Sequence, residues 1–207
     1  MQHASFGIPG GRSLFTPIDM AIKKGDAFVQ LTPWLIQTLV DWRFLVLAVA
    51  KRPTSIFQLI SRPPHYISYT DACGLGAGGV WCSGTSSLHP FLWQVEWPAD
   101  IKSNLVTSKN PLGSITINDL ELAGIVMGWL VLEVIQKDLA FTHIGMFADN
   151  TSSVSWAKKG NTTTSISAAR FLHFLPLWQQ ARQASSLIPL YICGEDNKMA
   201  DISSRAC

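Results

Sequence analysis

The stretch HYISYTD, residues 65–71, decides the fold. Aromatic or apolar residues alternate with polar ones as far as Thr70, which is typical of a strand with one buried face. The strand ends at Asp71, and a glycine-rich turn follows. Residues 78–82 and 90–95 have the composition of two further strands, separated by Ser- and Gly-rich turns. The stretch therefore begins a run of three strands joined as hairpins.

Beyond these strands the pattern alternates between helix and strand. The polar residues 97–117 predict a long loop, and Asn118 or Asp119 is the expected cap of the next helix. A mixed five-stranded sheet flanked by helices follows, which is an α/β fold. The remaining expected elements are a helix to about Lys137, a strand over 143–148, helices over 151–159 and 167–183 (with a kink at Pro176), a strand over 187–193 and a helix over 197–205.

Residues 1–64 form a separate block. Apolar residues from Pro33 to Ala50 have helical spacing, and Pro53, Pro63 and Pro64 then interrupt the chain. We expect a mainly helical appendage over residues 1–64 and the α/β domain over residues 65–207.

Composition limits the possible classes of protein. The chain has 207 residues, 47% of them hydrophobic and 14% charged, with a net charge of +2. This excludes global disorder, and it excludes a polycation that binds nucleic acid by bulk charge. The four cysteines form no C-x-x-C pair and no zinc-like cluster, so we expect reduced thiols. They are Cys73, Cys82, Cys193 and Cys207.

Neither apolar stretch of the chain resembles a membrane span. Residues 34–50 are interrupted by Asp41 and Arg43, and residues 122–135 are too short and contain Glu133. We expect both to be buried helices. The first residues lack the basic and apolar regions of a secretory signal. An intracellular protein, cytoplasmic or nuclear, is the expectation.

Four acidic residues occupy matched places in this pattern. Asp71 and Asp149 end strands, Glu121 falls in the expected first turn of a helix, and Asp201 lies on the last helix. Such positions converge at one edge of an α/β sheet. Clustered carboxylates repel one another unless a cation neutralises them, and their hard oxygens suit Mg²⁺ or Mn²⁺. Two such ions about 4 Å apart can activate a water and stabilise the leaving oxygen of a phosphodiester.

Each acid alone has a simpler explanation. Asp71 could form a turn, Glu121 could stabilise the helix dipole, and Asp149 could cap the following helix. Asp201 could be a solvated helix residue. The occurrence of all four at matched places favours a nuclease site.

The residues around these acids resemble ribonuclease H. Residues 69–74 with 76–80 (YTDACG and GAGGV) resemble its first catalytic strand and turn, 119–123 its second motif and 147–150 its third. The segment NKMADISSR, residues 197–205, resembles the Asn-x-x-Ala-Asp-x-x-Ser-Arg close of the ribonuclease H domain in retrotransposon polyproteins. The resemblance covers about residues 65–206 and implies a ribonuclease H-like fold.

The leading block is more loosely similar to the thumb and connection region of such reverse transcriptases. Residues 7–12 and 41–45 carry this similarity. It implies that the chain is the C-terminal part of a retrotransposon polymerase whose other polymerase domains would be its partners. The chain has no Tyr-x-Asp-Asp motif, which excludes reverse transcription by the chain alone.

The resemblance implies endonucleolytic cleavage of the RNA strand of an RNA–DNA hybrid. Two Mg²⁺ ions, or Mn²⁺, would be held by the catalytic acids Asp71, Glu121, Asp149 and Asp201. The backbone at Cys73 and Gly74 would recognise 2′-hydroxyls. The helix start at Asn150, Thr151 and Ser152 would bind a phosphate, or would simply be capped.

Three further points concern turnover and alternatives. Many ribonucleases H carry a mobile histidine before the last acid, but the histidine here, His173, lies among apolar residues and is expected to pack in a helix. Slower turnover without loss of chemistry would follow. The chain could instead be an inactive remnant or connection-type domain that only binds nucleic acid or protein. A DNA-cutting integrase or resolvase is disfavoured by the close at residues 197–205.

Overall fold

The computed structural model describes most of the chain. Its described residues are 28–51, 62–83, 90–136, 142–162, 164–182 and 186–206, with Gly11, Leu14, Phe15, Pro17, Ile18, Ile22, Pro53 and Leu139. The strands are β1 (Tyr66–Ala72), β2 (Gly76–Ser83), β3 (Phe91–Glu96), β4 (His143–Ala148) and β5 (Ser186–Tyr191). The helices are α2 (Pro33–Lys51), α4 (Ala99–Ser103), α5 (Ile117–Ile135), α6 (Thr151–Lys159), α7 (Ile166–Arg182), the 3-10 helix η2 (Gly194–Asp196) and α8 (Lys198–Arg205).

The strands form one mixed sheet in the order β3-β2-β1-β4-β5. β1, β2 and β3 are antiparallel neighbours, whereas β4 is parallel to β1 and β5 is parallel to β4. Two hairpins produce the antiparallel half, and helical crossovers produce the parallel half. The expected α/β class and mixed five-stranded sheet are confirmed.

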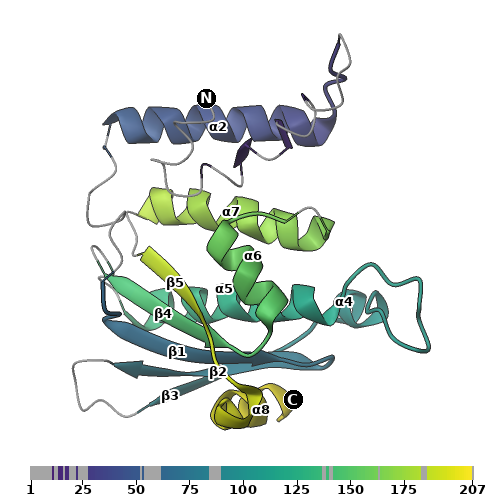
Figure 1. The fold of residues 1–207 in the computed structure, drawn as a ribbon, viewed down its shortest axis with the longest axis vertical. Helices are drawn as coiled ribbons and strands as arrows, with labels where there is room; N and C mark the ends of the chain where they lie inside the picture. The colour runs from purple at the N-terminus through teal and green to yellow at the C-terminus, as the bar shows by residue number, and fades with distance from the viewer. Residues whose placement is uncertain are drawn as a thin grey trace.

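Helices cover both faces of the sheet (Figure 1). α5 lies against one face with α6 and α7 beyond it, and α8 lies against the other. Neighbouring residues of β2 mark the two faces: a Cβ at Gly124 of α5 would lie 3.8 Å from Ala77, whereas a Cβ at Gly78 would collide with α8. The alternation of side chains along a strand accounts for this difference.

The main core lies between the sheet and α5. Trp81, Trp93 and Trp129 are buried in it, and the indole N–H of Trp81 donates to the carbonyl of Gly128 at 2.9 Å. β2, β3 and α5 thus each contribute one of these three tryptophans to the core. Trp156 and Trp178 are half-buried. The expected burial of residues 122–135 is confirmed, since most of their side chains lie inside.

α2 differs from the buried helix that its sequence predicts. It buries one stripe, formed by Leu35, Thr38, Trp42 and Leu45. The other side chains are mostly exposed, with Val40 55% and Leu47 52% accessible. Among the described helices α2 alone is long and apolar enough to cross a membrane, and a single apolar helix near an N-terminus is weak evidence of a span.

Several element boundaries correct the expectations from sequence. Residues 97–117 are not one loop: they contain α4 and an isolated bridge between Leu105 and Ile115. α5 is capped by Thr116, not by Asn118 or Asp119, because the Thr116 hydroxyl accepts from the Asp119 N–H while the Asp119 carboxylate accepts from the Thr116 N–H. β5 ends at Tyr191, and η2 precedes α8. Residues 7–10 and Arg12 of the leading block, Gln183 and Cys207 lie outside the described residues.

Candidate active site

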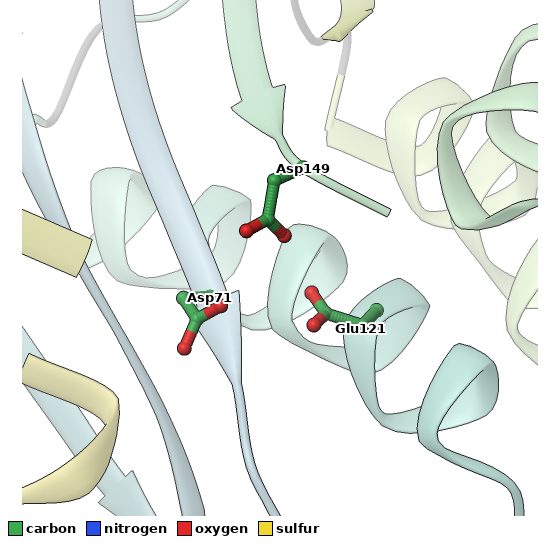
Figure 2. Close-up of side chains that lie close together, drawn as sticks. All are labelled: Asp71, Glu121 and Asp149. Atoms are coloured by element: carbon green, nitrogen blue, oxygen red, sulfur yellow. The ribbon is translucent and has the colours of Figure 1, made fainter. Parts of the chain in front are cut away.

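Three carboxylates from distant parts of the chain meet at the end of the sheet. Asp71 lies near the end of β1 and Asp149 follows β4 (Figure 2). Glu121 is in the second turn of α5 and not in the expected first turn, because the helix begins at Ile117. One oxygen of each lies within 4.8 Å of the others. The parallel pairing of β1 with β4 brings their carboxyl ends to the same edge, and α5 returns its first two turns to that edge.

Glu121 carries the strongest electrostatic signature of the site. Its pKa is raised to about 9, mainly by burial and also by the neighbouring charges of Asp71 and Asp149, while a backbone hydrogen bond at Ala72 opposes the shift. Its Oε2 atom is buried and has no hydrogen-bond partner among the described residues. A buried carboxylate oxygen without a partner is costly unless it is protonated or binds a cation.

The pKa values of Asp71 and Asp149 are also raised, mainly by burial. For Asp71 a hydrogen bond from Ser204 opposes this shift, and the charges of Asp149 and Asp201 add to it. The turn after β5 closes over Asp149, since a Cβ at Gly194 would lie 3.1 Å from its Oδ2. In all three acids the surroundings therefore stabilise the neutral form more than water does, unless a cation compensates the charge.

Asp201 lies at the rim of this cluster. It is outside the group of three, and its Oδ1 pairs with Nη2 and Nε of Arg205 at 2.6 and 2.7 Å. Its side chain is 40% accessible. Its charge still acts on Asp71 and Asp149, whose pKa values it raises. The structure thus brings together three of the four acids and places the fourth, Asp201, beside them in an ion pair with Arg205.

The donor set fits a hard divalent cation. All three groups offer carboxylate oxygens, which are the ligands that Mg²⁺ and Mn²⁺ prefer. A cation would satisfy the Oε2 of Glu121, which has no partner among the described residues, and would offset the burial and the repulsion that raise its pKa. Asp71, Glu121 and Asp149 are the residues that would hold it.

The turn after β1 has its backbone fixed from both sides. The Cys73 N–H donates to Gly76 O at 2.9 Å, and the Cys73 carbonyl accepts from the Trp97 indole at 2.9 Å. Gly74 is exposed at the tip of this turn, where a Cβ would lie 3.6 Å from Leu105. Of the two residues expected to recognise RNA, Gly74 has the more accessible backbone.

Asn150 acts as the N-cap of α6. Its side chain accepts from the Ser153 N–H at 2.9 Å and donates to Asn118 at 2.8 Å. Thr151 is exposed and Ser152 is half-buried. The capping role of Asn150 is therefore visible in the structure, and the phosphate role of the three residues stays a prediction.

Two polar residues near the site make contacts that sequence reasoning did not predict. Ser204 donates to Asp71 Oδ2 at 2.5 Å, and its place in the closing motif was the available signal. Asp119, two residues before Glu121, is buried and hydrogen-bonded to Thr116 and Ser165, so it connects the start of α5 with the residue that precedes α7. His173 is buried, 2.5 Å from Asp41, which confirms its packed position.

Comparison with known proteins gives matches among solved structures alone. No family model matches the sequence, and no curated protein matches it. A ribonuclease H1 of Halobacterium salinarum NRC-1 is 13% identical, with a TM-score of 0.45 and coverage of 67% of this chain and 92% of that one. LC11-RNase H1 in complex with RNA/DNA hybrid is 17% identical, with a TM-score of 0.49 and coverage of 67% of this chain and 92% of that one. A foamy viral protease-reverse transcriptase is 11% identical, with a TM-score of 0.32 and coverage of 91% of this chain and 36% of that one. The structural neighbours thus include ribonuclease H1 domains and a protease-reverse transcriptase.

Proposed function

We propose that the chain is a metal-dependent ribonuclease that hydrolyses the RNA strand of RNA–DNA hybrids by endonucleolytic cleavage. The observation that carries this proposal is the group of three carboxylates within 4.8 Å, one of which has a buried oxygen that no described residue hydrogen-bonds. Buried acids with raised pKa values at a sheet edge are costly to stability, and such groups cluster at functional sites.

The proposed roles follow from the position of each side chain. Asp71, Glu121 and Asp149 hold the cations, and Asp201, beside Arg205, completes the set from the rim. Bound Mg²⁺ or Mn²⁺, two ions in the proposal, would supply charge stabilisation for attack of water on the phosphodiester. The chain's own contribution is to fix these oxygens on β1, α5 and the end of β4.

The RNA–DNA hybrid would approach this edge of the sheet. The exposed turn at Gly74, next to Cys73, would read 2′-hydroxyls, and residues 150–152 would contact a phosphate. In this proposal residues 65–207 are the nuclease domain of a retrotransposon reverse transcriptase, and residues 1–64 are a thumb- or connection-like segment that contacts the other polymerase domains inside the cell.

Cleavage of a labelled hybrid tests the proposal directly. The full chain is incubated with an RNA–DNA hybrid in Mg²⁺ or Mn²⁺, beside D71N and D149N. D100N is the matched control, since Asp100 is an exposed acid of α4 outside the cluster. We expect cutting of the RNA strand alone, lost with EDTA, reduced at least about 100-fold in D71N and D149N, and unchanged in D100N.

Two results would contradict this expectation. A folded chain that cuts nothing with either cation would support an inactive remnant that only binds nucleic acid or protein. Equal activity in D71N, D149N and the parent chain would place the chemistry elsewhere.

A further inference from the structure

We propose that Ser204 is a positioning residue that orients the Asp71 carboxylate for cation binding; this inference rests on the proposed function. Ser204 is fully buried on α8, and its hydroxyl donates to Asp71 Oδ2 at 2.5 Å. The carbonyl of Asp201 is a second acceptor, at 3.0 Å. The carboxylate is the nearer acceptor and the one that carries charge when ionised, so the bond to Asp71 is the stronger of the two.

A glycine makes this contact possible. Gly78 of β2 is paired with Asp71 of β1, and a Cβ there would lie 2.6 Å from the backbone of Ser203 and Ser204. Backbone this close leaves no room for any side chain. The absence of a side chain at Gly78 therefore lets α8 approach the sheet directly beside Asp71.

Further hydrogen bonds fix α8 in this position. The buried amide of Asn197 donates to Thr70 O at 3.0 Å, and Ser203 donates to Trp93 O at 2.7 Å. The Cys73 thiol donates to the carbonyl of Ser204 at 3.2 Å. α8 is thus anchored to residues on both sides of Asp71 in the chain, through Asn197 before its first turn and through the carbonyl of Ser204, so the Ser204 hydroxyl has little freedom to move away.

The consequence concerns cation affinity. A carboxylate held through one oxygen loses less side-chain freedom when a cation binds, because its orientation is already fixed. Removal of such a supporting hydrogen bond weakens metal binding by about 10–100-fold. Ser204 would act through Asp71 and would not touch the cation or the RNA.

The experiment compares S204A with S203A in the full chain. Ser203 is a matched control, because it also docks α8 on the sheet by a side-chain bond but contacts a carbonyl of β3. Mn²⁺ binding is measured by electron paramagnetic resonance of the free ion, and cleavage is measured against Mn²⁺ concentration. We expect S204A to weaken Mn²⁺ binding about tenfold and to shift the activation curve equally, with S203A within about twofold of the parent.

A second variant, S204C, keeps the inference testable if S204A does not fold. S204C keeps nearly the same volume and replaces the hydroxyl by a weak donor, so with a phosphine reductant it should fold and still bind Mn²⁺ several-fold more weakly. Equal affinities of S204A and S203A, or parent-like binding by S204C, would overturn the inference. If the parent chain binds Mn²⁺ but cuts no hybrid, the result contradicts the proposed ribonuclease function alone. If the parent chain binds no Mn²⁺, the result contradicts both that function and the role of Ser204.

Discussion

Glu121 links the stability of the protein to pH. Its pKa in the folded chain is raised to about 9 from an ordinary value of 4.5, mainly by burial. Because the folded value is the higher one, the neutral form stabilises the fold fully below about pH 4.5, and this stabilisation is lost as the pH rises towards 9. Each pH unit in that window corresponds to about 1.4 kcal/mol for one ideal group.

We therefore expect E121Q to be less sensitive to pH than the parent chain. In buffer with EDTA, the stability of E121Q relative to the parent should grow by about 2–4 kcal/mol between pH 5 and pH 8. Urea unfolding at four pH values measures this difference, and any constant cost of the glutamine amide cancels from it. Mn²⁺ should stabilise the parent at pH 7 and E121Q much less. Parallel pH profiles of the two proteins would contradict the assigned pKa.

Some features of the site could be foreseen from single residues and some could not. Asp71 and Asp149 stand at visible strand ends, so their meeting at one edge follows from the pairing of parallel strands. The pairing of Asp201 with Arg205 is an i, i+4 contact within α8, so it needs helical spacing alone, whereas the place of Asp201 at the rim of the site depends on how α8 packs on the sheet. The contact between Ser204 and Asp71 joins residues 133 positions apart, so the closing motif marks Ser204 but does not identify Asp71 as its partner.

At the scale of the element, the start of α5 determines where Glu121 lies. Thr116 caps the helix, and the buried Asp119 accepts from the Thr116 N–H at 2.8 Å and from its hydroxyl at 2.7 Å. T116A removes the hydroxyl that accepts from the Asp119 N–H and leaves a buried carboxylate with one bond fewer. We expect a loss of about 2 kcal/mol in the free energy of unfolding.

T116S and S108A provide the comparison for this prediction. T116S keeps the capping hydroxyl and should lie within about 0.5 kcal/mol of the parent, as should S108A, whose serine is exposed in the preceding loop. Urea unfolding followed by circular dichroism measures all three. T116A and T116S of equal stability would show that the capping box contributes nothing.

The elements that sequence reasoning placed well are marked by an apolar run or by caps, and those it misplaced are too short for a pattern or have a misleading composition. β4 and α6 match their predicted ranges because an apolar run and an N-cap with a glycine C-cap define them. α4 is five residues long, too short for a periodic pattern. α2 is apolar on all sides, so its composition predicts burial, whereas one stripe alone is covered within the described residues.

At the scale of the molecule, the apolar interior is divided. The main cluster lies between the sheet and α5, and a separate cluster, Leu14, Ile18, Leu35, Trp42 and Leu45, has Phe15 and Leu177 packed against it. α7 therefore presents one side to α5 and another to α2 (Figure 1). The buried pair of His173 and Asp41 is a polar link across the α2 side.

This division predicts that residues 62–207 fold without the leading block. The sheet, α5 and α8 hold every residue of the carboxylate cluster, and none of the residues of α2 belongs to the main core. Loss of α2 exposes Leu177 and leaves His173 without Asp41, but the histidine then becomes accessible to water, so the cost is local. We expect a single cooperative thermal transition and a rise in Tm with Mn²⁺ within about 2 °C of that of the full chain.

A chain of residues 62–207 carrying L177Q, which removes the newly exposed apolar side chain, controls for aggregation. Absence of a cooperative transition in both shortened chains would show that α2 belongs to the same folding unit as the sheet.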